Sequence, residues 1–448
     1  MRQVQGLLET RPVRRDQLSR GSVAAVLLFG LLLIAGVREG GFWHTDAFVV
    51  AAGSIVLLAV AVATNRLDRR ALAVVAALIA LALWWGVRAT TAGSLSAVLP
   101  FGASCLACAS AYAAVRALRG RSRQLAALGI ACLGAAGSLV GFAGLIWRWF
   151  PLGMPAQGLW RLSTTLTYSD AAGLVLGMCL LVGLGVERHP GLVRVAVCLC
   201  GAGLLATQSR GAFLAFACAC MLVPWRRYRT FVVPLLAGVV LGVAAIATSP
   251  DPGGVPWLGV VLIAAIGIAA VPASSVRAAA RSPQIRMLAV FLALVGLLAS
   301  AILLHHEIGL RALAPSDQDR STEWSIAWHQ WGSAPVFGVG PDRLLLFHTV
   351  DGTYAKFVHN EYLQVAADAG AVGLALLLAA LLAIGRAVRR FDALSSCACA
   401  ALVCCAVGGA FDFDWHLPFV GLLAGGCAGL AARVDPVDAG RLRFDKGA

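Results

Sequence analysis

The sequence predicts an all-α polytopic integral membrane protein with about 12–14 transmembrane helices and one large extracytoplasmic loop. Three observations predict this fold class. The chain is 60% hydrophobic and only 13% charged, with a mean hydropathy of +0.83, which excludes an ordinary soluble domain. Apolar runs of bilayer length recur from one end of the chain to the other. One long polar stretch, residues 305–370, interrupts them near the end.

The apolar runs divide the chain into spans, connections and tails. We expect a cytoplasmic tail at 1–21, a transmembrane bundle at 22–304, the large loop at 305–370, C-terminal spans at 371–432 and a second cytoplasmic tail at 433–448. The segment at 22–37 starts too far into the chain for a simple signal peptide and lacks a cleavage site, so it is interpreted as the first span. The predicted spans, some shorter than the roughly 20 residues that cross hydrocarbon, are 22–37, 47–64, 71–87, 94–115, 125–147, 171–186, 191–207, 211–225, 231–248, 257–273, 287–304, 371–387, 393–410 and 417–432.

The distribution of basic residues predicts the orientation of these spans. If the N-terminus is cytoplasmic, 27 of the 36 Lys and Arg residues fall in inner segments and 9 fall outside. The net charge of +14 is then the positive-inside signal of a membrane protein and not a nucleic-acid footprint. Both termini are predicted to be cytoplasmic, and residues 305–370 are predicted to face outward.

All 13 cysteines lie inside predicted spans. Because a buried free Cys behaves as a small hydrophobic residue, we interpret them as packing residues. No disulfide framework is expected in the outer segments.

Among the outward arginines, Arg210 stands in the turn TQSRG between two short spans. A turn between short spans should lie at or below headgroup depth, where a charge usually faces a protein cavity or a partner. The alternative is that Arg210 reaches the interface or a phospholipid phosphate.

Arg320 begins a predicted amphipathic helix in the large loop, closed by Gly332. The apolar stripe of this helix consists of Trp324, Ala327, Trp328 and Trp331. Three Trp on one stripe suit a helix lying flat at a membrane interface. Arg320 precedes Trp324 by one turn and should point inward with it. The alternative is an arginine stacked on Trp324 for packing alone.

His359 opens a second predicted outer helix, HNEYLQVAADAG, which Gly370 ends just before the span 371–387. His359 shares one helix face with Leu363 and Ala366. A lone His is more often an ordinary polar residue than a catalytic one. The outward histidines show no metal-ligand spacing with carboxylates, so neither a metal nor another cofactor is expected.

The connection 148–170 carries interfacial aromatic residues, among them Tyr168, and then Asp170 at the mouth of a span. An acid at this position is either a helix N-cap or a site residue. Two D-x-D triplets, at 317–319 and 412–414, are interpreted as ordinary polar loop, with Phe413 and Trp415 in an interfacial belt.

These residues suit glycosyl transfer from a lipid carrier. Breaking the anomeric C–O bond of a lipid-pyrophosphate-linked sugar sends negative charge onto the pyrophosphate. Two arginines at membrane depth, Arg210 and Arg320, would stabilise that charge without a metal, because a guanidinium binds phosphate oxygens bidentately. A histidine such as His359 can accept the proton of the attacking hydroxyl.

Four short motifs occur in a characteristic order: SRG at 209–211, RSTEW at 320–324, GVG at 338–340 and HNEYL at 359–363. In their order, and in the span that follows them, they resemble the O-antigen ligase and O-antigen polymerase family of membrane glycosyltransferases. The resemblance covers roughly residues 160–390.

The resemblance implies a GT-C-like membrane fold, with Arg210 and Arg320 binding the pyrophosphate and His359 as the catalytic base. Candidate substrate-binding residues are Asn360, Trp324, Tyr168 and Asp170. The implied partners are an undecaprenyl-pyrophosphate-type lipid-linked donor and a glycan, glycolipid or protein acceptor, in polysaccharide biosynthesis for the cell envelope. The implied location is the bacterial cytoplasmic membrane, with the site facing outward. Many relatives have Asn where this chain has Asp170, and an acid there would repel a pyrophosphate.

Two other classes of protein remain as alternatives. A secondary transporter also has many spans, but it usually shows an internal repeat and charged residues in the middle of its spans. This sequence shows no repeat, and its spans are almost free of charge in their centres. A metal-dependent oligosaccharyltransferase acting on a lipid carrier would use the D-x-D triplets. Within the resembled family, the sequence leaves ligase and polymerase activities both open.

Overall fold

The computed structural model describes residues 15–65, 67–92, 95–156, 158–272, 317–343, 346–347, 354–355, 357–390 and 392–432. The predicted span at 287–304 and the first part of the large loop lie outside the described residues.

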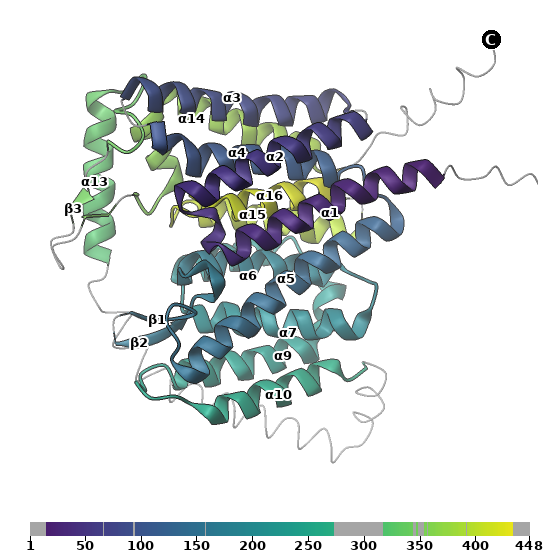
Figure 1. The fold of residues 1–448 in the computed structure, drawn as a ribbon. Coiled ribbons are helices and arrows are strands. Elements are labelled where there is room, and N and C mark those ends of the chain that lie inside the picture. The colour runs from purple at the N-terminus through teal and green to yellow at the C-terminus, as the bar shows by residue number, and fades with distance from the viewer. Residues whose placement is uncertain are drawn as a thin grey trace, which may run out of the picture.

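The described part of the chain is built almost entirely of helices (Figure 1). The α-helices are α1 (Arg15–Val37), α2 (His44–Thr64), α3 (Arg69–Ala92), α4 (Leu99–Val115), α5 (Gly120–Trp147), α6 (Ser169–Gly185), α7 (Pro190–Thr207), α8 (Arg210–Cys220), α9 (Trp225–Ala247), α10 (Pro256–Ala270), α13 (Asp317–Ser333), α14 (Glu361–Ala387), α15 (Ala393–Gly408) and α16 (Pro418–Ala431). Short 3-10 helices are η2 (Glu39–Gly41), η3 (Leu95–Val98), η4 (Thr164–Leu166) and η5 (Asp414–His416). Two antiparallel pairs of short strands complete it, β1 (Gly153–Ala156) with β2 (Leu159–Leu162) and β3 (Leu346–Phe347) with β4 (Tyr354–Ala355).

The predicted fold class is confirmed. Within the described residues, every predicted span coincides with a helix, and 7 helices are long and apolar enough to cross a membrane. Shorter apolar helices, α6 and α8 among them, account for the other predicted spans in this part of the chain. The protein is therefore an all-α polytopic membrane protein.

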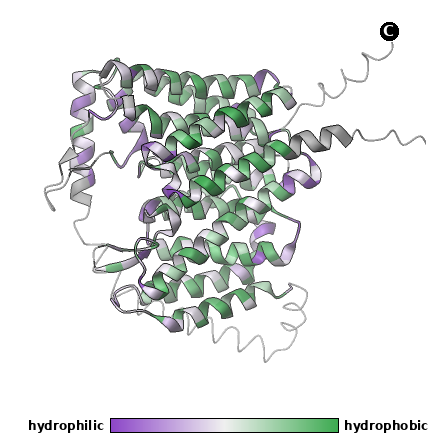
Figure 2. Cartoon of the chain, in the orientation of Figure 1, coloured by the Kyte–Doolittle hydropathy of each residue, from purple (hydrophilic) through white to green (hydrophobic). Residues whose placement is uncertain are grey.

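The apolar helices run side by side, and α13 lies across one end of them (Figure 1). We call this the α13 end of the bundle. Hydrophobic residues follow the length of the side-by-side helices, whereas α13 is more hydrophilic (Figure 2). At the opposite end, ion pairs join separate connections, with Arg116 binding Asp68 and Arg123 binding Asp392.

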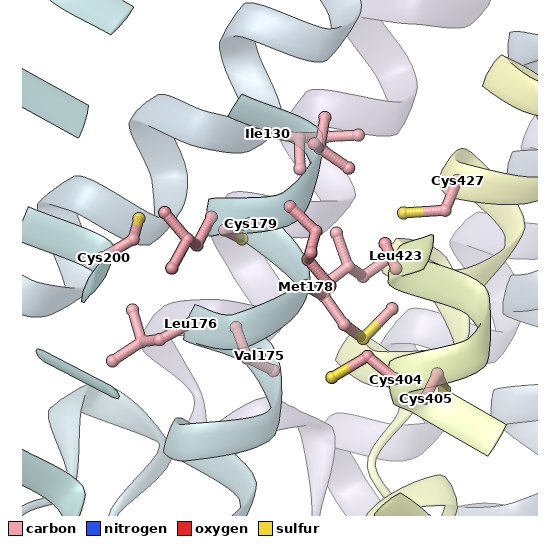
Figure 3. Packing of buried hydrophobic residues seen from close by; sticks show 14 of the residues in the cluster. Ile130, Val175, Leu176, Met178, Cys179, Cys200, Cys404, Cys405, Leu423 and Cys427 are labelled. Carbon is pink, nitrogen blue, oxygen red and sulfur yellow. The ribbon is translucent and has the colours of Figure 1, made fainter. Parts of the chain in front are cut away.

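Helix α6 lies at the centre of the core. All of its residues except Asp170 are buried, against α5, α7, α8 and α15. All thirteen cysteines are free and ten are buried, which confirms their interpretation as packing residues. Figure 3 shows Cys179, Cys404 and Cys427 among the aliphatic side chains of this core. Because α6 is held on all sides, its first turn is a fixed platform at the α13 end.

Candidate active site

A small polar pocket at the α13 end brings together segments that are far apart in the sequence. It lies where the N-termini of α6 and α8 approach α13 and the connection between α15 and α16. Its lining residues are Asp170, Leu174, Ser209, Gly211, Ala212, Arg320, Gly408, Phe411, Asp412 and Asp414. A helix N-terminus carries a partial positive charge, so α6 and α8 both make this pocket favourable for an anion.

Arg320 projects from the first turns of α13 into this pocket. Its Nη2 atom lies 3.9 Å from Asp170 Oδ2 and 3.9 Å from Asp412 Oδ2, and its side chain is 32% exposed. These separations exceed hydrogen-bond length, so the guanidinium is attracted to the two acids without being hydrogen-bonded to them. Burial lowers the pKa of Arg320, but the charges of Asp412 and Asp170 more than offset this and raise it. Arg320 therefore stays charged.

Asp170 has a cation of its own. An Nη2–H of Arg161, on β2, donates to Asp170 Oδ1 at 2.7 Å, and Nε–H of Arg161 donates to the Thr207 carbonyl at 2.8 Å. Asp170 lies in the first turn of α6, whose N-cap is Tyr168. It is therefore a pocket residue paired with Arg161, and the N-cap alternative is wrong.

Asp412 is almost fully buried and is held by Tyr168. The Tyr168 hydroxyl lies 2.9 Å from both carboxylate oxygens, and the Tyr168 ring stacks on Phe413 at 5.2 Å. Burial, reinforced by the charge of Asp170, raises the pKa of Asp412 to about 6. Burial and the neighbouring Asp412 charge also raise the pKa of Tyr168, so its hydroxyl keeps its proton and remains a donor.

His359 is fixed by α13 through three contacts. Its Nδ1 atom lies 2.7 Å from Glu323 Oε2, its backbone N–H donates to the same oxygen at 3.3 Å, and its carbonyl accepts from Trp324 Nε1 at 3.2 Å. A carboxylate only accepts hydrogen bonds, so Nδ1 carries the proton and Nε2 is left to accept one. Burial lowers the pKa of His359, but the Glu323 hydrogen bond and the Asp412 charge raise it above the ordinary value.

The packing of α13 explains how these contacts form. Ala327 is buried against Val358 and Ala367, and Trp324 and Trp331 cover the edges of this cluster. Arg320, Glu323, Trp324 and Ala327 thus share the face that meets the start of α14. Trp328, predicted on the same stripe, is 60% exposed, because the contact with α14 is narrow and Trp328 lies beyond its edge.

The GVG segment docks on a break in α14. Gly370 (φ +69°) interrupts the helix, as predicted, and Gly338 (φ +73°) packs directly on the exposed backbone. Backbone N–H groups of Val339 and Gly340 donate to the carbonyls of Ala367 and Asp368 at 2.8 and 3.0 Å. A Cβ at Gly338 would lie 2.4 Å from the Asp368 carbonyl carbon, so only glycine fits there.

Comparison of the sequence with models of known protein families gives a match. Residues 254–378 match the family model described as O-antigen ligase. This segment of the chain is O-antigen ligase-like. The matched segment contains Arg320, Glu323 and His359, and the family resemblance seen in the sequence is thereby confirmed. The match supports glycan transfer of the O-antigen ligase type in general. A search of curated proteins finds no match.

The remaining predicted site residues lie at the same end of the bundle. Arg210 is the first residue of α8, with an exposed side chain, and its neighbours Ser209 and Gly211 line the pocket. Asn360 is the N-cap of α14, where its side-chain oxygen accepts from Leu363 N at 3.0 Å. Asn360 therefore has the geometry of a helix cap next to His359. Trp324 contacts the backbone carbonyl of His359.

Sequence reasoning missed several residues at this site. Glu323 follows Arg320 by three residues, a helical spacing that places both on one face and was available as a signal. Arg161 gave no signal, because its pairing with Asp170 depends on how the chain folds back between them through the 3-10 helix η4.

The interpretation of 412–414 as ordinary polar loop is wrong. Asp412 and Asp414 are 4% and 2% exposed, and Phe413 stacks on Tyr168 inside the site. The reason is that α15 and α16 are short, so the turn between them lies inside the protein and not at its surface. Among the described residues, no group of three His, Cys, Asp or Glu side chains is arranged to hold a metal ion.

Proposed function

We propose that this protein transfers a glycan from an undecaprenyl-pyrophosphate-type lipid carrier to an acceptor hydroxyl at the outer face of the cytoplasmic membrane. The observation that carries the proposal is the Glu323–His359 pair, in which Glu323 lies on the same face of α13 as Arg320. A histidine and a permanent cation therefore lie at the same end of an apolar bundle, as a base and a pyrophosphate-binding group would need to.

In the proposed reaction the pyrophosphate of the donor binds at the pocket. Arg320 in the pocket and Arg210 beside it, at the start of α8, provide bidentate N–H donors. The phosphate oxygens replace the long contacts from Arg320 to Asp170 and Asp412. Arg161 already pairs with Asp170, and its positive charge offsets the repulsion expected between this acid and a pyrophosphate. The N-termini of α6 and α8 add to the attraction.

The acceptor hydroxyl attacks the anomeric carbon on the face opposite the pyrophosphate, which inverts that centre. The C–O bond to the phosphate breaks with its electron pair going to the phosphate oxygen, and the hydroxyl proton goes to His359 Nε2. Glu323 stabilises the imidazolium that forms, as a carboxylate does for other catalytic histidines. The products are the glycosidic bond and the lipid pyrophosphate.

This function is tested with purified protein, a lipid-pyrophosphate-linked glycan and an acceptor, in excess chelator. We expect the glycosidic product and free lipid pyrophosphate at the same rate with and without the chelator, because arginines stabilise the leaving group. Loss of activity in chelator, restored by magnesium or manganese, would instead favour the metal-dependent alternative. Glycan movement across vesicles with no bond formed would favour the transporter.

The same assay separates the two activities of the resembled family. A product in which donor repeat units join each other indicates a polymerase, and a product on a different lipid or protein acceptor indicates a ligase.

A further inference from the structure

A second histidine–carboxylate pair, Glu361 and His416, lies beneath the proposed active site and takes no part in the proposed reaction. Both side chains are buried, with 0% and 1% exposed. The His416 Nδ1 atom lies 3.2 Å from Glu361 Oε1 and 3.1 Å from Oε2. Because no surface of this pair is open, it cannot touch a substrate.

The surroundings of His416 are apolar except on the side of Glu361. Its ring lies 4.4 Å from the ring of Phe357, 5.2 Å from that of Phe101 and 5.8 Å from that of Trp85. Within the described part of the chain, its Nε2 atom has no hydrogen-bond partner. The polar contact that orients this ring is therefore the Nδ1–H bond to Glu361.

Glu361 ties two segments of the site together. It is the first residue of α14, two residues after His359, and its backbone N–H donates to the Gly409 carbonyl at 2.7 Å. Its carboxylate also accepts from the backbone N–H of Trp415. Glu361 thus grips the α15–α16 connection on both sides of Asp412, the acid that faces Arg320.

We propose that Glu361 and His416 are a positioning pair that fixes His359 relative to Asp412 and Arg320. Without the pair, the backbone bond from Glu361 to Gly409 would remain, but the α15–α16 connection would be held less firmly to the start of α14, and the base would lose its alignment with the leaving group. A displacement of about 1 Å at a reacting group can lower a rate about 100-fold. The catalytic consequence rests on the proposed function, whereas the geometric one does not.

Two substitutions of His416 test the proposal. His416→Phe keeps the ring among its aromatic neighbours and loses the Nδ1 donor. His416→Asn keeps an N–H donor near the Nδ1 position and loses the ring. If the pair positions the site, the Phe variant should show kcat lowered about 10- to 100-fold at little-changed donor KM, and the Asn variant should retain most of the activity. A merely structural role predicts the reverse, because the Phe variant preserves the packing.

A second readout does not depend on glycan transfer. His359 is faced by Glu323 and Arg320 from α13 and by Asp412 from the α15–α16 connection. The rate at which diethyl pyrocarbonate modifies His359, followed by mass spectrometry across pH, reports its titration. In the Phe variant the midpoint should move to lower pH, since Asp412 is no longer held beside His359, and in the Asn variant it should stay.

The two readouts separate the possible failures. If no protein, wild type included, transfers glycan, the proposed function is overturned. The positioning pair is then tested by the titration of His359. A wild-type midpoint and a wild-type kcat in the Phe variant would overturn the positioning pair. The pair would also be overturned if kcat fell equally in both variants, in parallel with a lower melting temperature.

Discussion

At the residue scale, the site is a set of charges that neutralise one another until a substrate arrives. Arg320 lies 3.9 Å from two carboxylates, and both of these have a closer partner, Arg161 for Asp170 and Tyr168 for Asp412. The long contacts from Arg320 therefore cost little to exchange for phosphate oxygens, which accept shorter and stronger bonds.

We predict that His359→Ala lowers transfer about 100- to 10,000-fold, the usual contribution of a general base, while donor binding is retained. Retention is expected because the proposed mechanism assigns the pyrophosphate contacts to arginines. The assay is product formation by purified protein, with binding of the labelled donor measured in parallel. His329→Ala is the matched control, since His329 is exposed on α13 and, within the described part of the chain, its ring hydrogen-bonds to the Ser325 carbonyl of the same helix. Undiminished transfer by His359→Ala would exclude His359 as the base.

The pH dependence follows from Glu323. His359 accepts a proton only when neutral, so activity should fall as pH drops through its pKa, which lies above the ordinary value. Glu323→Gln removes a negative charge that raises this pKa, so the acid limb of the kcat profile should move to lower pH and the maximum rate should fall. Glu187→Gln, an exposed glutamate at the opposite end of the bundle, serves as the control. An acid limb that stays in place would show that another group controls it.

Replacing Arg320 by Lys should lower transfer about 100- to 1,000-fold, the cost of removing a preorganised donor to a developing anion. The lysine keeps the charge but loses the planar fork that binds two oxygens at once. Steady-state rates of Arg320→Lys and of the exposed control Arg229→Lys, at matched membrane abundance, measure this. Equal activity of the two proteins would show that Arg320 contributes only its positive charge and not the planar fork of its guanidinium.

At the element scale, the break in α14 converts one long helix into two functional pieces. The short piece before Gly370 carries Asn360 and the docking surface for α13, and the longer piece after it coincides with the predicted span 371–387. Segment 335–343 fills the break with backbone hydrogen bonds, and side chains of α3 hold the junction, with Arg88 donating to the Gly338 carbonyl and Trp84 to the Ala369 carbonyl.

This close approach makes Gly338 intolerant of a side chain. Gly338→Ala combines a positive φ with a 2.4 Å clash against the Asp368 carbonyl carbon, and we expect it to cost about 1–3 kcal/mol of stability. The melting temperature of the purified variant measures this. Gly332→Ala is the control, because a Cβ there meets nothing within 4 Å. Similar melting temperatures for the two variants would contradict the close approach.

At the scale of the whole molecule, the helices sort charge between the two ends of the bundle. The site lies at the α13 end, and the arginine-rich connections meet one another at the opposite end, where Arg227 also binds the Leu184 and Val186 carbonyls. The positive-inside rule predicts that this opposite end faces the cytoplasm.

Labelling of single added cysteines tests this orientation. Ser333→Cys, at the exposed end of α13, should react in intact cells with a membrane-impermeant maleimide, above the background of the native cysteines. Arg188→Cys, exposed at the opposite end, should react only after the cells are opened. The reverse pattern would place the site in the cytoplasm and rule out transfer at the outer face.

The sequence alone determined the membrane architecture and the local placement of the candidate site residues. Apolar length predicts the spans because a bilayer imposes it. Helical spacing placed Arg320 and Trp324 on one face, and His359 and Gly370 marked the ends of the helix that follows. These features are local in the chain, so local periodicity is enough to predict them.

The tertiary structure decided which residues meet. Asp412 lies 242 positions after Asp170, yet both face Arg320, because α6 and α15 pack along their length and their ends at the pocket coincide. The burial of Asp412 and of His416 depends on how short α15 and α16 are relative to their neighbours, which hydropathy does not report. Pairing across such distances is set by packing of the whole bundle, and no spacing within one segment encodes it.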